Sequence, residues 1–395
     1  MVYIVSAVRT PIGKYGGALK DVRPDDLCAL VIKEVINRIS LDPNLIDDVY
    51  IGCANQAGED NRNVARMAVL LAGLPWTIPA CTVNRLCGSG LEAVNIAFKS
   101  ILSGEADIIV AGGVESMTRA PYVMPKPDQA FKRGNFEVYD TSLGWRFINP
   151  KFPFYPYSMG ETAENLAELY KISREEQDLF AYRSHLKAVK AIDEGKFKEE
   201  IVPVSLPDGK IFEIDEGPRR DTSIEKLSKL KPAFKENGTV TAGNSSSLND
   251  GACALILVSE KKLKELNLKP LARIIGTSVV GVNPDIMGIG PAFAIKKLLK
   301  RFNLNLSDIK LFEINEAFAA QVLAVLREIE IEEKKLNVNG GAIALGHPLG
   351  CSGARILTTL IYELRRRGGG LGIASLCIGV GQGIATLIEV YSHNQ

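Results

Sequence analysis

The sequence predicts an α/β protein built from two similar parts with a long insertion between them. Short β-branched runs alternate with helical patterns up to about residue 117 and again from residue 272 onward. The segment between them is rich in proline, aromatic and charged residues and has no sheet rhythm. A glycine-rich motif opens one helix in each part, which indicates an internal duplication and a pseudo-twofold pair of domains.

Strands and helices follow from the period of the apolar residues. The expected strands are Val2–Val5, Asp48–Gly52, Ile108–Ala111, Arg273–Thr277, Leu311–Asn315 and Gly372–Leu376. The expected helices are Leu27–Ile39, Leu91–Leu102, Thr162–Tyr170, Arg174–Glu194, Phe293–Arg301, Ala317–Arg327 and Ala354–Arg367.

Composition favours a large globular protein. The 395 residues are 46% hydrophobic and carry a formal charge of +1, so no basic field indicates nucleic acid or an anionic membrane as a partner. No apolar run has membrane-spanning length, and the start lacks a signal-peptide pattern. Seven scattered cysteines suit a reducing compartment. We therefore expect a cytoplasmic protein with free thiols.

Cys87 has the setting of a nucleophile. It lies in NRLCGSG, whose glycines allow a tight turn directly before the helix Leu91–Leu102. At a helix N-terminus the macrodipole and free N–H groups favour a thiolate, so we expect a lowered thiol pKa and a place for an oxyanion. The alternative is that a small residue simply fits a crowded turn.

His347 is the histidine whose setting suggests chemistry. It lies in a glycine-rich loop before a helix, whereas His185 sits in a polar helical pattern and His393 in the tail. A structural role is the alternative. Cys377 follows the strand Gly372–Leu376 and precedes a glycine-rich turn. Because another strand follows this turn, it is not a dinucleotide-binding fingerprint.

Other polar and thiol side chains leave more than one interpretation open. Asn315 can project from a strand end into a cleft or cap the helix near Ala317. Cys351 precedes a helix and is a reserve nucleophile. Zinc binding is the competing use of the cysteines and histidines, but no CxxC pair is present, so no metal is expected. The remaining cysteines are expected to be inert core thiols: Cys28, Cys53, Cys81 and Cys253.

In combination, six motifs resemble the thiolase family from end to end of the chain. They are NRLCGSG around Cys87, GGVESM at 112–117, AGNSSSLNDGA at 242–252, NEAFA at 315–319, GGAIALGHPLGCSGAR at 340–355 and CIGVGQG at 377–383. The resemblance implies the thiolase fold, two similar αβαβα domains with an inserted loop domain. The expected domains are residues 1–117 plus about 247–270, an inserted domain at 118–246 with the coenzyme A and acyl pockets, and residues 271–395.

The resemblance also assigns roles. Cys87 takes the acyl group as a thioester, and His347 draws its proton and then polarises the substrate thioester oxygen. Cys377 is the implied acid and base at the α-carbon. The N–H groups of Cys87 and Gly379 are implied to stabilise the oxyanion of the tetrahedral adduct at Cys87. His347 and a water held by Asn315 are implied to stabilise the enolate. Coenzyme A is expected as substrate or product, with no permanently bound cofactor.

A coenzyme A site is implied by the same resemblance. Met159 is assigned to the wall of the acyl pocket, and Arg219 matches an arginine that contacts the nucleotide. The residues assigned to the pantetheine arm are Ser246, Ala233, Phe234 and Ala317. The cations expected to add positive charge for the phosphates, or else to form a solvated face, are Arg220, Lys226, Lys229 and Lys231.

Acetoacetyl-CoA, longer 3-ketoacyl-CoA and β-ketoadipyl-CoA remain open as substrates. Ser158 stands where many acetoacetyl-CoA thiolases have histidine, and segments 52–75 and 139–150 resemble β-ketoadipyl-CoA thiolases, although Gly160 replaces their usual proline. A decarboxylating condensing enzyme would usually pair its cysteine with two histidines or with a histidine and an asparagine, and a non-catalytic acyl-CoA carrier would lack the nucleophile or its partners. The Cys377 turn argues against the first, and the complete residue set against the second. The family also implies a homodimer or homotetramer.

Overall fold

A ten-stranded mixed β-sheet runs through the protein, which the computed structural model describes over residues 1–391. The strands in order across the sheet are β12 (Leu311–Ile314), β13 (Gly370–Ile378), β14 (Gln382–Val390), β11 (Ala272–Gly281), β1 (Val2–Arg9), β10 (Asn249–Ser259), β5 (Ile108–Ser116), β3 (Asp48–Gly52) and β4 (Cys81–Val83), with β2 (Gly13–Lys14) paired to β10. The two halves of the sheet join where β1 pairs with β11 over only two residue pairs, Tyr3 with Arg273 and Ile4 with Ala272.

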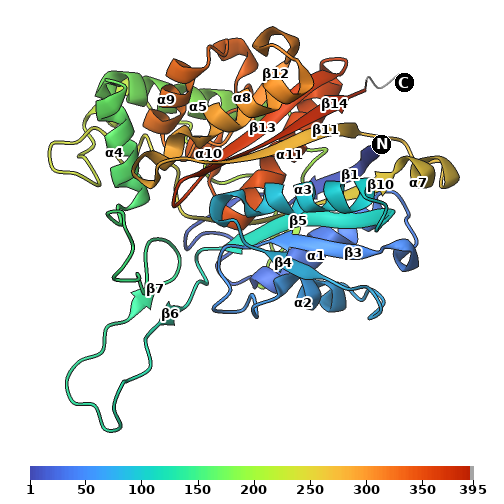
Figure 1. Ribbon diagram of the computed structural model, residues 1–395, viewed down its shortest axis with the longest axis horizontal. Helices are drawn as coiled ribbons and strands as arrows, with labels where there is room; N and C mark the ends of the chain where they lie inside the picture. Colours follow the sequence, from blue (N-terminus) through green and yellow to red (C-terminus); the bar gives the residue numbers. More distant parts are fainter. Residues whose placement is uncertain (392–395) are drawn as a thin grey trace.

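Helices cover both halves of the sheet and fill the space between them (Figure 1). On the outer face of the first half lie α1 (Pro24–Asn37) and α2 (Val64–Leu71), and on that of the second half lie α8 (Gly290–Phe302) and α9 (Ala319–Glu328). Between the halves lie α3 (Ser89–Leu102) and α11 (Leu349–Arg366). This layering is the αβαβα arrangement that the resemblance implied.

The inserted segment and the connections carry the smaller elements. A long excursion between β6 and β7 projects from the body of the molecule (Figure 1). The helices outside the main layers are α4 (Met159–Leu169), α5 (Arg174–Asp193), α6 (Ile224–Ser228), α7 (Glu260–Glu265) and α10 (Ala342–Leu345). The short strand pairs are β6 (Tyr122–Val123) with β7 (Tyr139–Asp140), and β8 (Val204–Ser205) with β9 (Ile211–Phe212).

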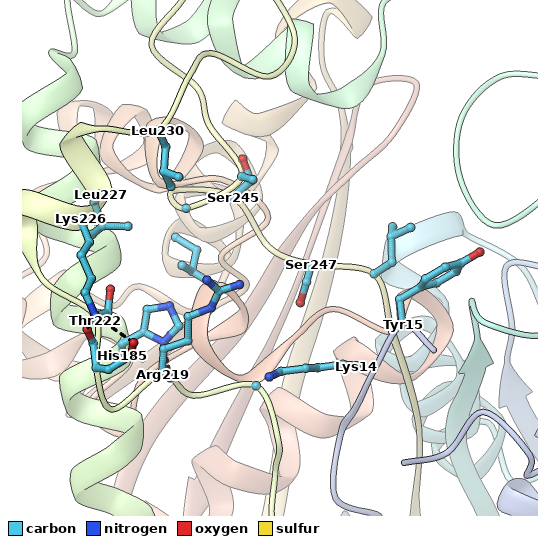
Figure 2. Close-up of a pocket in the computed structure, with 16 residues that line it drawn as sticks. Lys14, Tyr15, His185, Arg219, Thr222, Lys226, Leu227, Leu230, Ser245 and Ser247 are labelled. Atoms are coloured by element: carbon cyan, nitrogen blue, oxygen red, sulfur yellow. Dashed lines mark hydrogen bonds and ion pairs between the residues drawn. The ribbon is translucent and has the colours of Figure 1, made fainter. Parts of the chain in front are cut away.

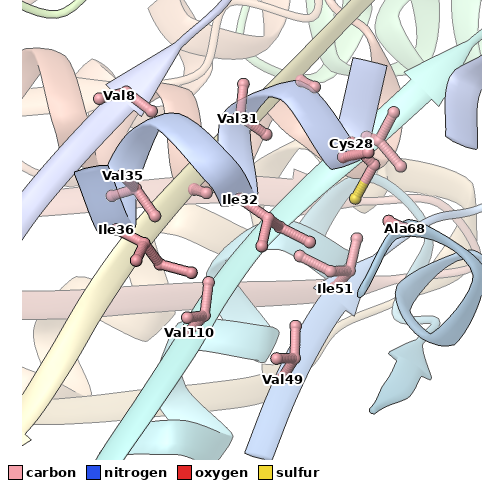
Figure 3. Close-up of a cluster of buried hydrophobic side chains, with 14 of the residues drawn as sticks. Val8, Cys28, Val31, Ile32, Val35, Ile36, Val49, Ile51, Ala68 and Val110 are labelled. Atoms are coloured by element: carbon pink, nitrogen blue, oxygen red, sulfur yellow. The ribbon is translucent and has the colours of Figure 1, made fainter. Parts of the chain in front are cut away.

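Buried strands hold the layers together because both of their faces are apolar. In β5, Ile108 and Val110 face the outer helices, while Ile109 and Ala111 face the central pair. Figure 3 shows the outer cluster, in which side chains of α1 such as Ile32 pack against β3 and β5. Every position of β5 is buried, so this strand is a rigid support for the loop that follows it.

The central helices approach each other through glycines. A Cβ on Gly90 of α3 would lie 2.6 Å from the carbonyl oxygen of Gly350 and 2.9 Å from the amide nitrogen of Ala354 in α11. A Cβ on Gly353 of α11 would likewise overlap the backbone of Leu91. With no side chain at these positions, the first turns of the two helices pack backbone against backbone.

All the expected helices and strands occur, with ends shifted by a few residues. The elements that had not been predicted include α2, β4 and the long central strand β10, as well as the short elements β2, β6, β7, β8, β9, α6, α7 and α10. The insertion, whose sequence shows no obvious sheet rhythm, contains the two short strand pairs β6–β7 and β8–β9. The division into three domains stays a prediction.

We predict that Gly90→Ala lowers the free energy of unfolding by about 1–3 kcal/mol, because overpacking against a backbone outweighs the roughly 1 kcal/mol gain in helix propensity. Chemical denaturation measures the change. The matched control is Gly281→Ala, where an added Cβ meets no atom within 4 Å. Equal stability of Gly90→Ala and the wild-type protein would contradict the close helix contact.

Candidate active site

One pocket of about 130 Å³ brings together most of the residues that the sequence singled out. It lies where α3, α11 and the turn after β13 meet, and its lining includes Cys87, His347 and Cys377. Four residues assigned to coenzyme A or the acyl chain also line it: Met159, Phe234, Ser246 and Ala317. Sequence reasoning had not assigned the rest of the lining, which is Met117, Leu143, Gly144, Ser158, Gly160, Ser247, Leu248, Met287, Phe318 and Leu349.

Cys87 sits in a 3₁₀ turn, Leu86–Gly88, directly before α3, as predicted. Leu86 adopts a φ of +46°, a left-handed conformation that is uncommon for a leucine. A Cβ on Gly88 would lie 2.7 Å from the side chain of Ile378, so this glycine lets the cysteine turn close onto the end of β13. The turn therefore presents the Cys87 thiol, which is half-buried, to the pocket.

The predicted lowering of the Cys87 pKa is wrong for the unliganded enzyme. Burial raises the pKa of the Cys87 thiol to about 11, and the negative charge of Glu115 adds to the rise. The backbone N–H groups of Gly379 and of Cys87 itself act in the opposite direction. Desolvation outweighs the helix terminus because the thiol faces an apolar pocket, so the resting nucleophile is a neutral thiol.

His347 is buried and held on two sides. Its backbone N–H donates to Asn249 Oδ1 at 2.9 Å, and its Nδ1 lies 2.5 Å from the hydroxyl of Ser352. Because that hydroxyl donates to the carbonyl oxygen of Pro348, it is left to accept from Nδ1–H, which leaves a lone pair on Nε2. Burial, followed by the charge of Arg355, lowers the pKa of His347 to about 3. The imidazole is therefore neutral at rest and can accept a proton.

Cys377 is the second thiol of the pocket and is fully enclosed. Burial raises its pKa, and so does the nearby Cys87 thiol. The two sulfurs are thus close enough to influence each other's ionisation. Gly379, two residues further on, directs its N–H at the Cys87 sulfur. The two N–H groups that were expected to hold an oxyanion therefore both face the sulfur of Cys87.

Asn315 does not cap a helix. The N-cap of α9 is Phe318, whereas the Nδ2 of Asn315 lies 3.4 Å from each ring nitrogen of His347. Its Oδ1 is buried and has no hydrogen-bond partner within residues 1–391. The capping role is therefore excluded, and Asn315 is buried beside His347 without lining the pocket itself.

A second pocket of about 360 Å³ shares the lining residues Ser247 and Leu248 with the first, so the two pockets are adjacent. Arg219 lines it, and its backbone N–H donates to Nδ1 of His185 at 3.0 Å (Figure 2). The side chains of Arg219 and Lys14 make no ion pair in the described part of the chain and lie at this pocket. Burial, and then Arg219 and Lys14, lower the pKa of His185 to about 4, so this imidazole is neutral.

Several cations expected at the phosphates are engaged elsewhere. Arg220 pairs with Asp193, and Lys229 pairs with Glu225. Neither cation lines the pocket that Arg219 lines. Lys231 does not line that pocket either. Lys226 does line it, but its amino group is bound to Asp221. The local positive charge comes instead from Lys14, far away in sequence, in a glycine-rich segment that gave no signal.

The remaining predictions give mixed results. Ala233 is exposed and lines neither pocket, so its place beside the pantetheine arm is not seen. Cys81 is exposed, which corrects the expectation of a core thiol. Cys351 is buried outside the pocket lining. His393 lies outside the described residues. The thiols found buried as expected are Cys28, Cys53 and Cys253.

Two searches for other features gave nothing in residues 1–391. No group of three or more histidine, cysteine, aspartate or glutamate side chains is arranged to hold a metal ion. None of the helices between these residues combines the length and apolarity needed to cross a membrane.

We predict that alkylation of Cys87 by iodoacetamide in the unliganded enzyme accelerates steadily from about pH 7 to about pH 10. With a pKa of about 11, the thiolate fraction rises about tenfold per pH unit over this range. Mass spectrometry of the Cys87 peptide measures the rate and separates it from the exposed Cys81. A plateau that begins near neutral pH would show a preformed thiolate and contradict the burial argument.

Comparison with known proteins matches nearly all of the described chain to one family. Residues 2–261 match "Thiolase, N-terminal domain" and residues 268–390 match "Thiolase, C-terminal domain". The β-ketoadipyl-CoA thiolase of Pseudomonas knackmussii is 54% identical over 396 residues, 98% of each chain. The acetyl-CoA acetyltransferase of Bacillus anthracis has a TM-score of 0.94 and 48% identity, covering 98% of each chain. Human mitochondrial 3-ketoacyl-CoA thiolase in complex with CoA has a TM-score of 0.93 and 44% identity, covering 99% of this chain and 98% of that one. The chain belongs to the thiolase family of acyltransferases.

Proposed function

We propose that the chain catalyses the reversible cleavage of a 3-ketoacyl-CoA by the thiol of coenzyme A and, in reverse, the Claisen condensation of two acyl-CoA molecules. One observation carries this proposal: the thiols of Cys87 and Cys377 lie near each other in one pocket with the imidazole of His347. Two thiols suit a reaction that moves an acyl group between thioesters, because the group stays at similar energy throughout.

In the first half-reaction Cys87 gives its proton to Nε2 of His347, and its sulfur attacks the C3 carbonyl of the substrate. The N–H groups of Cys87 and Gly379, which face this sulfur, stabilise the oxyanion. The C2–C3 bond then breaks, its electron pair passes into the enolate of acetyl-CoA, and Cys377 protonates C2. The protonated His347, with a water on the free Oδ1 of Asn315, stabilises the enolate oxygen.

In the second half-reaction the Cys377 thiolate takes the proton of an incoming coenzyme A. The coenzyme A sulfur attacks the acyl-Cys87 thioester, the acyl group leaves as acyl-CoA, and Cys87 recovers the proton held by His347. Each proton therefore returns to its starting group after one turnover. Cys377 is suited to both proton transfers because it is enclosed next to the nucleophile, away from solvent.

Coenzyme A would bind along the path formed by the two pockets. Its phosphates would meet the side chains of Lys14 and Arg219, whose positive charges have no protein partner in residues 1–391. The pantetheine arm would then pass Ser247 and Leu248, which both pockets share, and bring its sulfur to Cys87. His185, in its neutral form, would hold the backbone of Arg219 in place. A homodimer or homotetramer stays a prediction from the family.

A dicarboxylic acyl chain is the second candidate substrate, and Arg146 favours it. Cleavage of β-ketoadipyl-CoA, the substrate named for the Pseudomonas relative, leaves a succinyl group with a free carboxylate on Cys87. Such a charge needs a partner near an apolar pocket. Arg146 is half-buried, follows the pocket-lining residues Leu143 and Gly144, and has no hydrogen bond or ion pair within residues 1–391.

We predict that the wild-type enzyme cleaves 3-ketoacyl-CoA only when coenzyme A is present, and that Cys87→Ser abolishes both half-reactions. Cys377→Ser should still be acylated by acetyl-CoA at Cys87 but should lose at least about 100-fold in kcat for cleavage, because it lacks the acid and base. Loss of the ketoacyl thioester measures cleavage, and intact mass measures acylation. Full activity of either variant would refute these roles.

We predict that Arg146→Gln raises KM for β-ketoadipyl-CoA by about tenfold and leaves KM for acetoacetyl-CoA unchanged, because a lost charge pair corresponds to about 1.4 kcal/mol. Arg146 lies two residues after the pocket-lining Gly144 without lining the pocket itself, and the control is Lys151→Gln, an exposed cation further along the same segment. Equal effects on both substrates, or no effect on either, would contradict a role in binding the distal carboxylate.

A further inference from the structure

Glu115 occupies in the first half of the molecule the place that Cys377 occupies in the second. Each is the next-to-last residue of a nine-residue strand that follows a central helix, β5 after α3 and β13 after α11. Each of the two strands pairs with a parallel neighbour: β5 pairs with β3, and β13 pairs with β12. At equivalent positions, the first half of the sheet therefore carries a carboxylate, Glu115, and the second half carries a thiol, Cys377.

The strand registers support this correspondence. The last residue of β3, Gly52, lies beside Gly113 of β5, and the last residue of β12, Ile314, lies beside Ser375 of β13. Glu115 lies two residues after Gly113, and Cys377 lies two residues after Ser375. Likewise, Cys87 and His347 each stand two residues before the first residue of a central helix.

The Glu115 carboxylate joins segments from both halves of the chain. It is buried, and its Oε2 accepts hydrogen bonds from the N–H of Ala54 at 2.9 Å and of Gly350 at 2.8 Å. Its Oε1 accepts from the N–H of Asn55 at 3.0 Å. Gly350 is in the first turn of α11, where N–H groups have no partner within the helix, so Glu115 caps α11 from another strand.

The hydrogen bonds of Glu115 connect it to the segment that carries His347 and to the segment that carries Cys87. On one side, Gly350 is three residues after His347. On the other, the amide of Asn84 donates to the carbonyl oxygen of Ala54 at 3.1 Å and accepts from the N–H of Leu86 at 2.9 Å, directly before the cysteine turn. The carboxylate therefore lies at the centre of a path, made of hydrogen bonds and short main-chain segments, that connects the His347 loop with the cysteine turn.

We propose that Glu115 is a positioning residue of the thiolase reaction, the non-reactive counterpart of Cys377, which fixes the distance between Cys87 and His347. The inference rests on the proposed function. An ionised carboxylate is required, because three N–H donors converge on its two oxygens and an amide would set a fourth donor against them. Burial raises the pKa of Glu115 to about 7, and the titratable groups that face it are Cys53, Asp60, Cys87 and Cys351.

The test compares Glu115→Gln with Glu363→Gln, a buried carboxylate near the other end of α11 that bonds to Asn339, Arg366 and Arg367. We expect Glu115→Gln to lower kcat for thiolysis by about 10–100-fold, as displacement of reacting groups by about 1 Å does, with KM for coenzyme A within about twofold. Alkylation of Cys87 should be at least as fast as in the wild type, because a negative charge near the thiol has been removed. The control should keep its kcat.

Three results would overturn the proposal: normal kcat in Glu115→Gln, equal loss of kcat in Glu363→Gln, or slowed alkylation of Cys87 together with the loss of kcat, which indicates general damage. If Glu115→Gln does not fold, Glu115→Asp is the test variant. It keeps the charge, but it is one methylene too short to accept from Ala54 and Asn55 and from Gly350 at the same time. It should lose kcat, and full activity would contradict the proposal. Absence of thiolysis in the wild-type enzyme would instead refute the proposed function itself.

Discussion

The backbone contact between α3 and α11 is the constraint on which the site depends. Gly90 and Gly353 let the first turns of the two helices touch, and each helix is preceded by a reactive residue, Cys87 or His347. The halves of the sheet share only two residue pairs, so this central layer, rather than the sheet, sets how the halves face each other. The pocket between them takes Cys87, the proposed nucleophile, from one half, and His347, the proposed base, and Cys377 from the other. Neither half could hold the complete site.

Burial governs the reactivity of that site. It raises the pKa of Cys87 to about 11 and lowers that of His347 to about 3, so both groups are neutral in the resting enzyme. In the proposed mechanism, proton transfer between them creates opposite charges that stabilise each other, and the N–H groups of Cys87 and Gly379 stabilise the negative charge on the substrate oxygen. The enzyme thus develops charge where the substrate lies and is protected from side reactions of a permanent thiolate.

Sequence reasoning found residues that line one pocket where those residues lie in glycine-rich turns. Cys87 and His347 lie next to Gly88 and Gly346, and Cys377 lies two residues before Gly379, whereas the helices and strands were found from the period of their apolar residues. It failed where three-dimensional context decides. The central strand β10 begins in a glycine- and serine-rich motif that is typical of a loop, Lys14 reaches the second pocket from the far end of the chain, and Cys81 lies on an edge strand that had not been predicted. The Cys87 pKa was predicted in the wrong direction because the sequence shows a helix terminus but not the apolar walls around the thiol.

The central claim is that the acyl group is carried by Cys87 between the two half-reactions. The most direct measurement is to incubate the wild-type enzyme with acetyl-CoA, quench it in acid, digest it and locate the acetyl group by mass spectrometry. The account predicts a single acetylated peptide, containing Cys87, whose label is lost when coenzyme A is added before the quench. Acetylation of Cys377 or Cys351 instead, or no covalent acyl group at all, would contradict it.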